Sequence, residues 1–329
     1  MMRKEDIQKV SGYIPEYGIL KRKHYSVINI TVSGDAPKEV VRAYFYKKGN
    51  QRSHKWPMYI AKVGHKHYPI ESITEYLLNK LGTIFGLNMA ESELSYVQHS
   101  TSKQLRFFSK YFLDHKNEQL VHGADIYATY LDDQDIIIQI EAEKKERDII
   151  TVQEAQLAIL NLFPNNPEIF KEYIKLLLFD ALIGNHDRHF YNWGCIKSLT
   201  KVDIRFSPIY DTARGLLWNY SDEELLNWMA NPSLKTSKMN KYINASMPKI
   251  GWDGIDNINH IKLIELIFKN EMGMNKEEII TFFDDSMLYK AIDYINNGPF
   301  KSLFINERLI LIIECLTLRF KKIKEIISA

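Results

Sequence analysis

The residues best suited to chemistry lie in two short segments, the first of which directly follows an apolar, helix-like stretch. Asp187 and Asn192 stand five residues apart in the first segment, and Asp211 follows 24 residues after Asp187. Phosphoryl transfer needs an acid near the attacking hydroxyl and oxygen ligands for a Mg²⁺ that bridges the phosphates. Carboxylate and amide oxygens suit Mg²⁺. The spacing therefore predicts that Asp187 accepts the proton of an acceptor hydroxyl or orients it, and that Asn192 and Asp211 hold the metal.

The first part of the chain supplies groups that can contact phosphates. Residues 33–38 form a polar turn between two strand-like segments, with backbone N–H groups and the Lys38 ammonium available to phosphate oxygens. Lys62 lies in a strand-like segment, and a predicted helix with Glu75 follows it. In protein kinases such a lysine and glutamate position the α- and β-phosphates. Taken alone, a hairpin turn and a surface lysine are the simpler interpretations.

The elements that must position Lys62 are mainly strands. β-branched and aromatic residues predict strands at 25–32, 40–46 and 58–63, and two more are expected at 90–97 and 105–112. Apolar residues at helical spacing predict one helix at 71–85. Ser72 as N-cap and Glu75 three residues later fit a capping box at its start.

Helical periodicity dominates the rest of the chain. Helices are predicted at 152–162, 167–183, 258–268, 276–283 and 307–327. A strand-rich part followed by a helical part is an α+β pattern. The sequence thus predicts two lobes, a strand-rich N-lobe at residues 1–112 with the phosphate turn and Lys62, and a helical C-lobe at residues 113–329 with the catalytic and metal loops.

The composition excludes several classes of protein. With 45% apolar and 26% charged residues, the 329-residue chain is expected to fold. The net charge of +2 argues against a dedicated nucleic-acid binder. Two cysteines exclude a disulfide scaffold and a cysteine-based zinc site. The chain has no apolar run of about 20 residues and no signal-peptide core, so a cytoplasmic protein is expected, with signal-less secretion left open.

Four segments, in this order along the chain, resemble the HipA-like serine/threonine kinase family. Residues 33–38 are similar to its Ser-Gly-x-Gln-x-Lys phosphate loop, with Ala36 in place of the usual Gln. Lys62 with Glu75-Tyr76 is similar to its strand lysine and helix Glu-Tyr. Residues 187–192 are similar to its Asp-x-His-x-x-Asn catalytic loop, and residues 208–211 to its Pro-x-Tyr-Asp metal motif. Only about 30 residues precede the phosphate loop, so the chain resembles the compact members of the family.

The resemblance implies a two-lobed protein-kinase-like fold that binds ATP and Mg²⁺ between its lobes. In that fold Asp187 acts on the acceptor hydroxyl, His189 orders the catalytic loop, and Asn192 and Asp211 hold the metal. The implied nucleotide-binding residues are Ser33, Gly34, Asp35, Ala36, Lys38, Lys62, Glu75, Ser109 and Tyr111. Of these, Ser109 and Tyr111 belong to the adenine-binding linker. Thr31 and Ser33 are the hydroxyls expected to become autophosphorylated, which would place negative charge beside the ATP phosphates and weaken ATP binding.

The predicted function is therefore an ATP- and Mg²⁺-dependent serine/threonine protein kinase that acts as a toxin or an effector. The resemblance implies a protein substrate with a Ser or Thr acceptor, and an antitoxin or a host protein as partner. No membrane partner is expected, and the near-neutral charge argues against direct binding of nucleic acid.

Two alternatives are consistent with parts of the sequence. A pseudokinase would bind the nucleotide without transferring phosphate. A metallophosphoesterase is suggested by residues 184–187 and by residues 64–67, which resemble fragments of a two-metal site. In such enzymes the Gly-His-x-His segment comes last, whereas here it comes first, and the required Gly-Asp-x-x-Asp is absent from the sequence. In the kinase interpretation His65, His67 and His186 are loop side chains.

Overall fold

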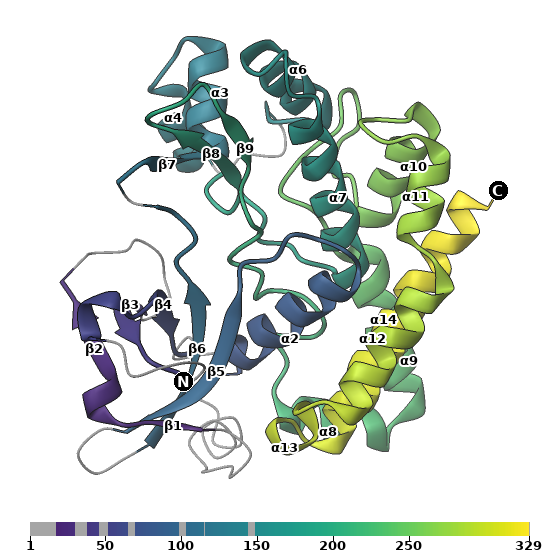
Figure 1. The fold of residues 1–329 in the computed structure, drawn as a ribbon. Coiled ribbons are helices and arrows are strands. Elements are labelled where there is room, and N and C mark those ends of the chain that lie inside the picture. The colour runs from purple at the N-terminus through teal and green to yellow at the C-terminus, as the bar shows by residue number, and fades with distance from the viewer. Residues whose placement is uncertain are drawn as a thin grey trace.

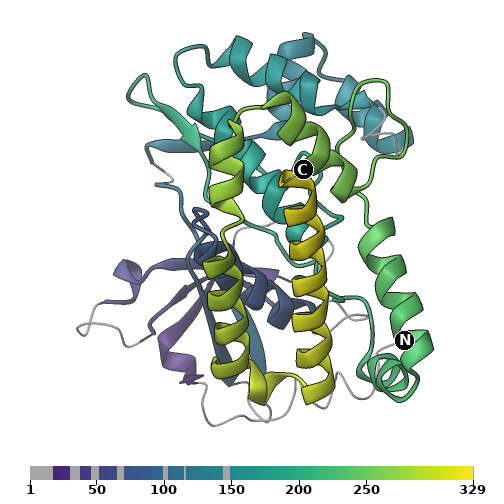
Figure 2. The same cartoon turned by 90° about the vertical axis from the view of Figure 1, so that its right-hand side faces the viewer.

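Residues 18–29, 38–45, 52–64, 70–98, 103–114, 116–143 and 149–328 are described by the structure, which is a computed structural model. Figures 1 and 2 show a strand-rich part and a helical part that meet along helix α2 (Glu71–Ile84). The phosphate turn at 33–37 and the segment 65–69 lie outside the described residues.

The strand-rich part is a six-stranded sheet in the order β1-β5-β6-β4-β3-β2. Its strands are β1 (Ile19–Leu20), β2 (Tyr25–Ile28), β3 (Lys38–Ala43), β4 (Met58–Lys62), β5 (Ser92–Gln98) and β6 (Lys103–Lys110). All neighbours are antiparallel except β1 and β5, which run parallel. In the register of β3 with β4, Lys38 stands opposite Lys62. The two lysines expected to contact phosphates therefore lie on adjacent strands.

The helical part carries a second, three-stranded sheet in the order β7-β8-β9. These strands are β7 (Glu118–His122), β8 (Gly194–Ser198) and β9 (Ile204–Phe206). The helices are α3 (Gly123–Leu131), α4 (Ile136–Glu143), α6 (Val152–Leu162), α7 (Glu168–Ile183), α8 (Asp222–Ala230), α9 (Pro232–Ala245), α10 (His260–Asn270), α11 (Lys276–Phe282), α12 (Asp285–Asn297), α13 (Phe300–Leu303) and α14 (Asn306–Ile327). Two short 3₁₀ turns lie at Arg22–His24 and Ser53–Lys55. No helix in the described part of the chain is long and apolar enough to cross a bilayer.

The predicted strands and helices are largely confirmed, with small shifts at their ends. The five predicted strands correspond to β2 to β6, although part of the first lies outside the described residues. The predicted helix at 152–162 has the bounds of α6, where Thr151 accepts a hydrogen bond from the Glu154 N–H at 3.1 Å. Helices α3, α4, α8, α9, α12 and α13 and strands β1, β7, β8 and β9 were not predicted.

The predicted capping box of α2 is wrong. The N-cap is Ile70, which makes no side-chain capping bond, and Ser72 is buried inside the first turn. Glu75 does not reach back to the start of the helix, because its carboxylate accepts a hydrogen bond from Lys62 at 2.8 Å. An ion pair with another element has replaced the local capping bond.

Helix α2 belongs to the packing of both parts. Its buried residues Ile73, Leu77 and Leu81 contribute to one large apolar cluster that also includes residues of β5, β6, α7 and α14. Figure 1 shows α2 between the sheet and the C-terminal helices α12 and α14. A smaller apolar cluster, with Val41, Tyr59 and Phe108, is separate from it. The helix that carries Glu75 is thus held on two sides.

Candidate active site

Lys62, at the end of β4, is the centre of a buried ion-pair cluster. Its ammonium donates a hydrogen bond to Glu75 Oε1 at 2.8 Å and another to Asp211 Oδ1. Lys62 and Glu75 are buried, whereas the Asp211 side chain is 35% exposed. Glu75 comes from α2, and Asp211 comes from the loop that follows β9. The cluster therefore joins the sheet, α2 and the metal loop at one point.

The charges in this cluster affect one another strongly. Partial burial opposes ionisation of Asp211, but the ammonium of Lys62, helped by Lys38, outweighs it and holds the pKa of Asp211 below its usual value. Burial raises the pKa of Glu75 to about 7, against the opposing effect of Lys62. The side chain of Asp211 is thus anionic across the ordinary pH range.

Asp211 adopts a left-handed backbone conformation with φ of 54°. Non-glycine residues seldom adopt positive φ, and such strain tends to persist where the surroundings impose it. The residue before it is fixed as well, because the Tyr210 hydroxyl lies 3.0 Å from His122 Nδ1 and donates to the Tyr191 carbonyl at 3.0 Å. The conformation turns the carboxylate towards Lys62.

The catalytic loop begins where α7 ends at Gly184, which has a φ of 69°. The Asn185 amide donates to Asp180 Oδ1 at 2.8 Å, and its own oxygen accepts the Asp187 N–H at 3.2 Å. Five residues on, the Asn192 amide nitrogen donates to the Asp187 carbonyl at 2.8 Å. This hydrogen bond uses the amide nitrogen of Asn192 and leaves its amide oxygen available.

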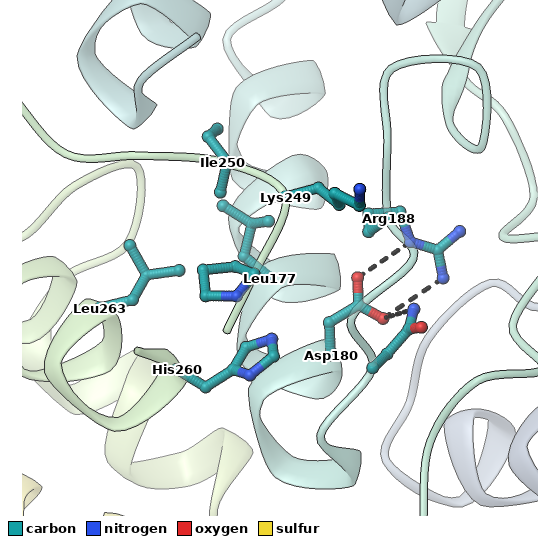
Figure 3. A pocket seen from close by; sticks show the side chains of 9 residues that line it. Leu177, Asp180, Arg188, Lys249, Ile250, His260 and Leu263 are labelled. Atoms are coloured by element: carbon teal, nitrogen blue, oxygen red, sulfur yellow. Dashed lines mark hydrogen bonds and ion pairs between the residues drawn. The ribbon is translucent and has the colours of Figure 1, made fainter. Parts of the chain in front are cut away.

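Arg188 ties the catalytic loop to the metal loop. Its guanidinium is buried and pairs with Asp180 of α7 at 2.9 Å. It also donates to the carbonyls of Asn192 at 2.6 Å and Tyr210 at 2.8 Å, and to the Thr212 hydroxyl at 2.7 Å. Figure 3 shows the guanidinium facing the Asp180 carboxylate in a small pocket that His260 also lines. One side chain thus fixes the spacing of the two loops that carry Asn192 and Asp211.

The carboxylate of Asp187 has a cationic neighbour. Arg214 Nη1 lies 3.1 Å from Asp187 Oδ2, and Arg214 Nε donates to Glu71 Oε1 at 3.2 Å. Beside them, burial lowers the pKa of His189, although the charge of Asp187 and that of Asp211 oppose this effect. The neutral imidazole of His189 accepts the Tyr191 N–H at 3.3 Å through Nδ1. This contact lies within the catalytic loop, where an ordering role was expected.

The structure gives less information on the other predicted site residues. Ser109 is buried within β6 and pairs with residues of both β4 and β5. The Tyr111 N–H donates to the Met58 carbonyl at 2.9 Å, so this amide is used within the sheet. Beyond it, the Phe112 ring lies 5.8 Å from the Tyr210 ring, next to the metal loop. The adenine-linker assignment of Ser109 and Tyr111 stays a prediction. The remaining predicted nucleotide-binding and autophosphorylation residues, Thr31, Ser33, Gly34, Asp35 and Ala36, lie outside the described residues.

Sequence reasoning missed Arg188 and Arg214. Asp180, an acid inside the apolar run of α7, was a signal that a buried cation must lie nearby. No local pattern indicated the contact of Arg214 with Glu71, since 143 residues separate them.

The donor set fits a nucleotide with Mg²⁺. Asp211 is anionic, the Asn192 amide oxygen is available, and the ammonium of Lys62 is held in place by two carboxylates. Magnesium at phosphate sites is commonly bound by one or two protein carboxylates, with phosphates and water completing the shell.

The fold is a two-lobed kinase-like fold, as expected from the sequence. The chain belongs to the HipA-like C-terminal domain family, whose model matches residues 30–277. The structure is similar to that of the Helicobacter pylori proinflammatory kinase CtkA, with 19% identity, a TM-score of 0.66 and coverage of 96% of this chain and 94% of that one. It is also similar to HipA of Shewanella oneidensis MR-1, solved with HipB and operator DNA, with 12% identity, a TM-score of 0.53 and coverage of 91% and 67%. No curated protein sequence matches the chain.

Proposed function

We propose that this protein is an ATP- and Mg²⁺-dependent kinase that phosphorylates Ser or Thr residues of proteins. The observation that carries the proposal is the junction of Lys62 with Glu75 and Asp211, together with the catalytic loop that Arg188 holds against the metal loop. Within a family of kinase-like fold, this arrangement brings an ammonium, an anionic metal ligand and a second acid to one site.

Each side chain has a role in the proposed reaction. Lys62 binds the ATP phosphates, and Glu75 orients Lys62. Asn192 and Asp211 hold Mg²⁺, which neutralises charge on the phosphates when it is bound. Asp187 accepts the proton of the acceptor hydroxyl or orients that hydroxyl, and neutral His189 keeps the loop in shape. Lys38 contacts the phosphates in this proposal, and the turn at 33–37 that is expected to cover them lies outside the described residues.

The first prediction is that charge removal at Asp187 or Asp211 greatly lowers the rate of phosphate transfer. Purified Asp187→Asn and Asp211→Asn should each lower the rate of phosphate transfer from labelled ATP to a generic protein acceptor by about 100-fold or more, the scale of a lost catalytic group. Asp203→Asn, in the exposed turn between β8 and β9, is the matched control and should keep the wild-type rate.

The same incubation tests the autophosphorylation that we propose for Thr31 or Ser33. Intact mass and peptide mapping should show one of these residues phosphorylated in the wild type and neither in Asp187→Asn. Full activity of Asp187→Asn would overturn the catalytic assignment. Tight ATP binding by a wild type that transfers no phosphate would indicate a pseudokinase, and hydrolysis of phosphoesters without ATP would indicate a metallophosphoesterase.

We further propose that the physiological acceptor is another protein and that the kinase acts as a toxin or an effector. The support is the similarity to CtkA, described as a proinflammatory kinase, and to HipA of a toxin–antitoxin system. An antitoxin or a host protein is the corresponding partner, and the cytoplasm of the producing or receiving cell is the site of action. Comparison of phosphosites in cells that produce wild type or Asp187→Asn identifies the acceptor.

A further inference from the structure

Helix α2 presents two carboxylates to the site, although the proposed function uses only one. Glu71 and Glu75 are one helical turn apart, so they share a face of the helix. Both are buried, with 7% and 4% of their surface exposed. A buried carboxylate needs a charged or hydrogen-bonding partner. Glu75 has Lys62, and Glu71 has Arg214.

The partners of the two carboxylates lie on different sides of the site, one beside the expected phosphates and the other beside Asp187. Glu75 holds Lys62, which belongs to the phosphate side. Glu71 accepts from Arg214 Nε at 3.2 Å, while Nη1 of the same guanidinium lies 3.1 Å from Asp187 Oδ2. The guanidinium also lies over the Trp218 ring at 5.1 Å, which favours one orientation of its plane. Glu71 is therefore connected through Arg214 to Asp187, the acid proposed to act on the acceptor hydroxyl.

The backbone around Arg214 is fixed on both sides. Before it, Asp211 has positive φ, and after it Leu216 and Leu217 do as well, with φ of 44° and 65°. The Leu216 N–H donates to the Ile183 carbonyl at 2.9 Å, at the end of α7. A side chain at Gly215 would meet that same carbonyl oxygen at 2.9 Å. Arg214 thus projects from a strained segment docked on the helix that begins the catalytic loop.

We propose that Arg214, oriented by Glu71, is a positioning residue for Asp187, so that α2 sets both the phosphate-binding lysine and the acceptor-side acid. The ion pair engages Oδ2 of Asp187 and leaves Oδ1 to accept a hydrogen bond from the acceptor hydroxyl. This inference rests on the proposed kinase function.

The test separates turnover from nucleotide binding in the full-length protein. Arg214→Gln and Glu71→Gln should each lower kcat about 10- to 100-fold, the scale expected when a reacting group is misplaced, and should change the KM for ATP less than about twofold. Glu75→Gln should instead raise the KM for ATP. Arg214→Lys retains a charge for Asp187 and should recover part of kcat. Arg205→Gln, on the exposed face of β9, is the control and should behave as wild type.

A double variant distinguishes positioning from a general loss of structure. If Arg214 acts through its link to Glu71, the double variant of Glu71→Gln with Arg214→Gln should lose no more kcat than Arg214→Gln alone. Thermal unfolding of each variant checks that the fold is retained. Multiplicative losses, or a higher KM for ATP at unchanged kcat, would overturn the inference while leaving the kinase function intact. A wild type without phosphate transfer would overturn both.

Discussion

Lys62 joins three parts of the site, because it lies on the sheet and contacts Glu75 of α2 and Asp211 of the metal loop. Some of the contacts around it could be predicted from the sequence and others could not. The contact with Glu75 was predictable because a strand lysine followed by a helix glutamate is a recurrent pair. The capping box at Ser72 was wrong because a local pattern cannot reveal that Glu75 is already bound to another element. The contact of Arg214 with Glu71 was not predictable either, since it depends on how distant segments fold together.

Protonation of His260 at the start of α10 should weaken the fold in acid. The side chain is fully buried, and its Nδ1 lies 2.6 Å from the Ser246 hydroxyl. Burial, with the nearby charge of Arg319, lowers the pKa of His260 well below the ordinary value for histidine. The unfolded chain therefore binds more protons than the folded one. The stability contributed by the neutral ring is intact above pH 6.5 and is lost as the pH falls below it.

We therefore expect His260→Gln to flatten the pH dependence of the free energy of unfolding. Between pH 6.5 and 5, urea unfolding should show a slope smaller than that of wild type by at most about 1.4 kcal/mol per pH unit, the value for one proton. His54→Gln, at an exposed position in the 3₁₀ turn before β4, is the control. Equal slopes for wild type and His260→Gln would show that this ring titrates normally in the folded protein.

At the scale of elements, helices were predicted from apolar residues at helical spacing, with or without a local cap. Helix α6 has Thr151 as a capping residue, whereas α14 was predicted although its N-cap Ile305 makes no side-chain capping bond. Helix α12 has a capping residue, Asp284, and was not predicted. Helix α9 buries only Met239 and Ile243, so its sequence has little periodic signal. Helix α8 was recognisable only from its capping box of Ser221 and Glu224. A helix that buries few residues has little sequence signal of its own, because its position depends on the elements against which it packs.

Helix α7 positions the catalytic loop through buried arginines at its C-terminal end. Arg188 pairs with Asp180, and Arg319 of α14 donates to the Ala181 carbonyl at 2.6 Å and the Leu182 carbonyl at 3.1 Å. Cations near the last carbonyls of a helix are favoured by its dipole. The loop thus leaves α7 from an end held by the C-terminal helix.

Loss of the Arg188 guanidinium should lower both stability and kcat, whereas loss of a second buried arginine, Arg308, should lower stability alone. Arg188→Met leaves Asp180 buried without its cation, which should cost about 3–5 kcal/mol. Arg308→Met should cost a similar amount, because Arg308 and Asp222 are equally buried and 2.7 Å apart. Only Arg188→Met should also lower kcat in the folded protein at low temperature. Arg188 contacts Tyr210 and Thr212, on either side of Asp211, whereas Arg308 contacts the loop after β9 only at its far end, through the carbonyls of Leu217 and Tyr220. Unchanged kcat in folded Arg188→Met would show that the loops hold their spacing without it.

For the whole molecule, the main question is whether the two lobes are separate folding units. The predicted boundary between residues 112 and 113 leaves α2 with the strands, yet α2 shares its apolar cluster with the helical part. Phe85, just after α2, lies 6.2 Å from Phe179 of α7 and 6.5 Å from Phe320 of α14, ring centre to ring centre. Separating the lobes would expose this surface to water, at about 25 cal/mol per Å². The packing therefore predicts that strands and helices unfold together.

Cooperative unfolding can be tested by two substitutions that each create a cavity, one in each apolar cluster. Leu77→Ala in α2 and Val41→Ala in β3 remove fully buried side chains from the shared and the sheet-only cluster. The leucine truncation should cost about 2–5 kcal/mol. If the molecule is one cooperative unit, each variant should lower the hydrogen-exchange protection of the slowest amides in β6 and in α14 by the same free energy. A Val41→Ala variant that loses protection in β6 while α14 keeps it would show that the strand-rich lobe opens alone, and the boundary at 112 would then mark an independent domain.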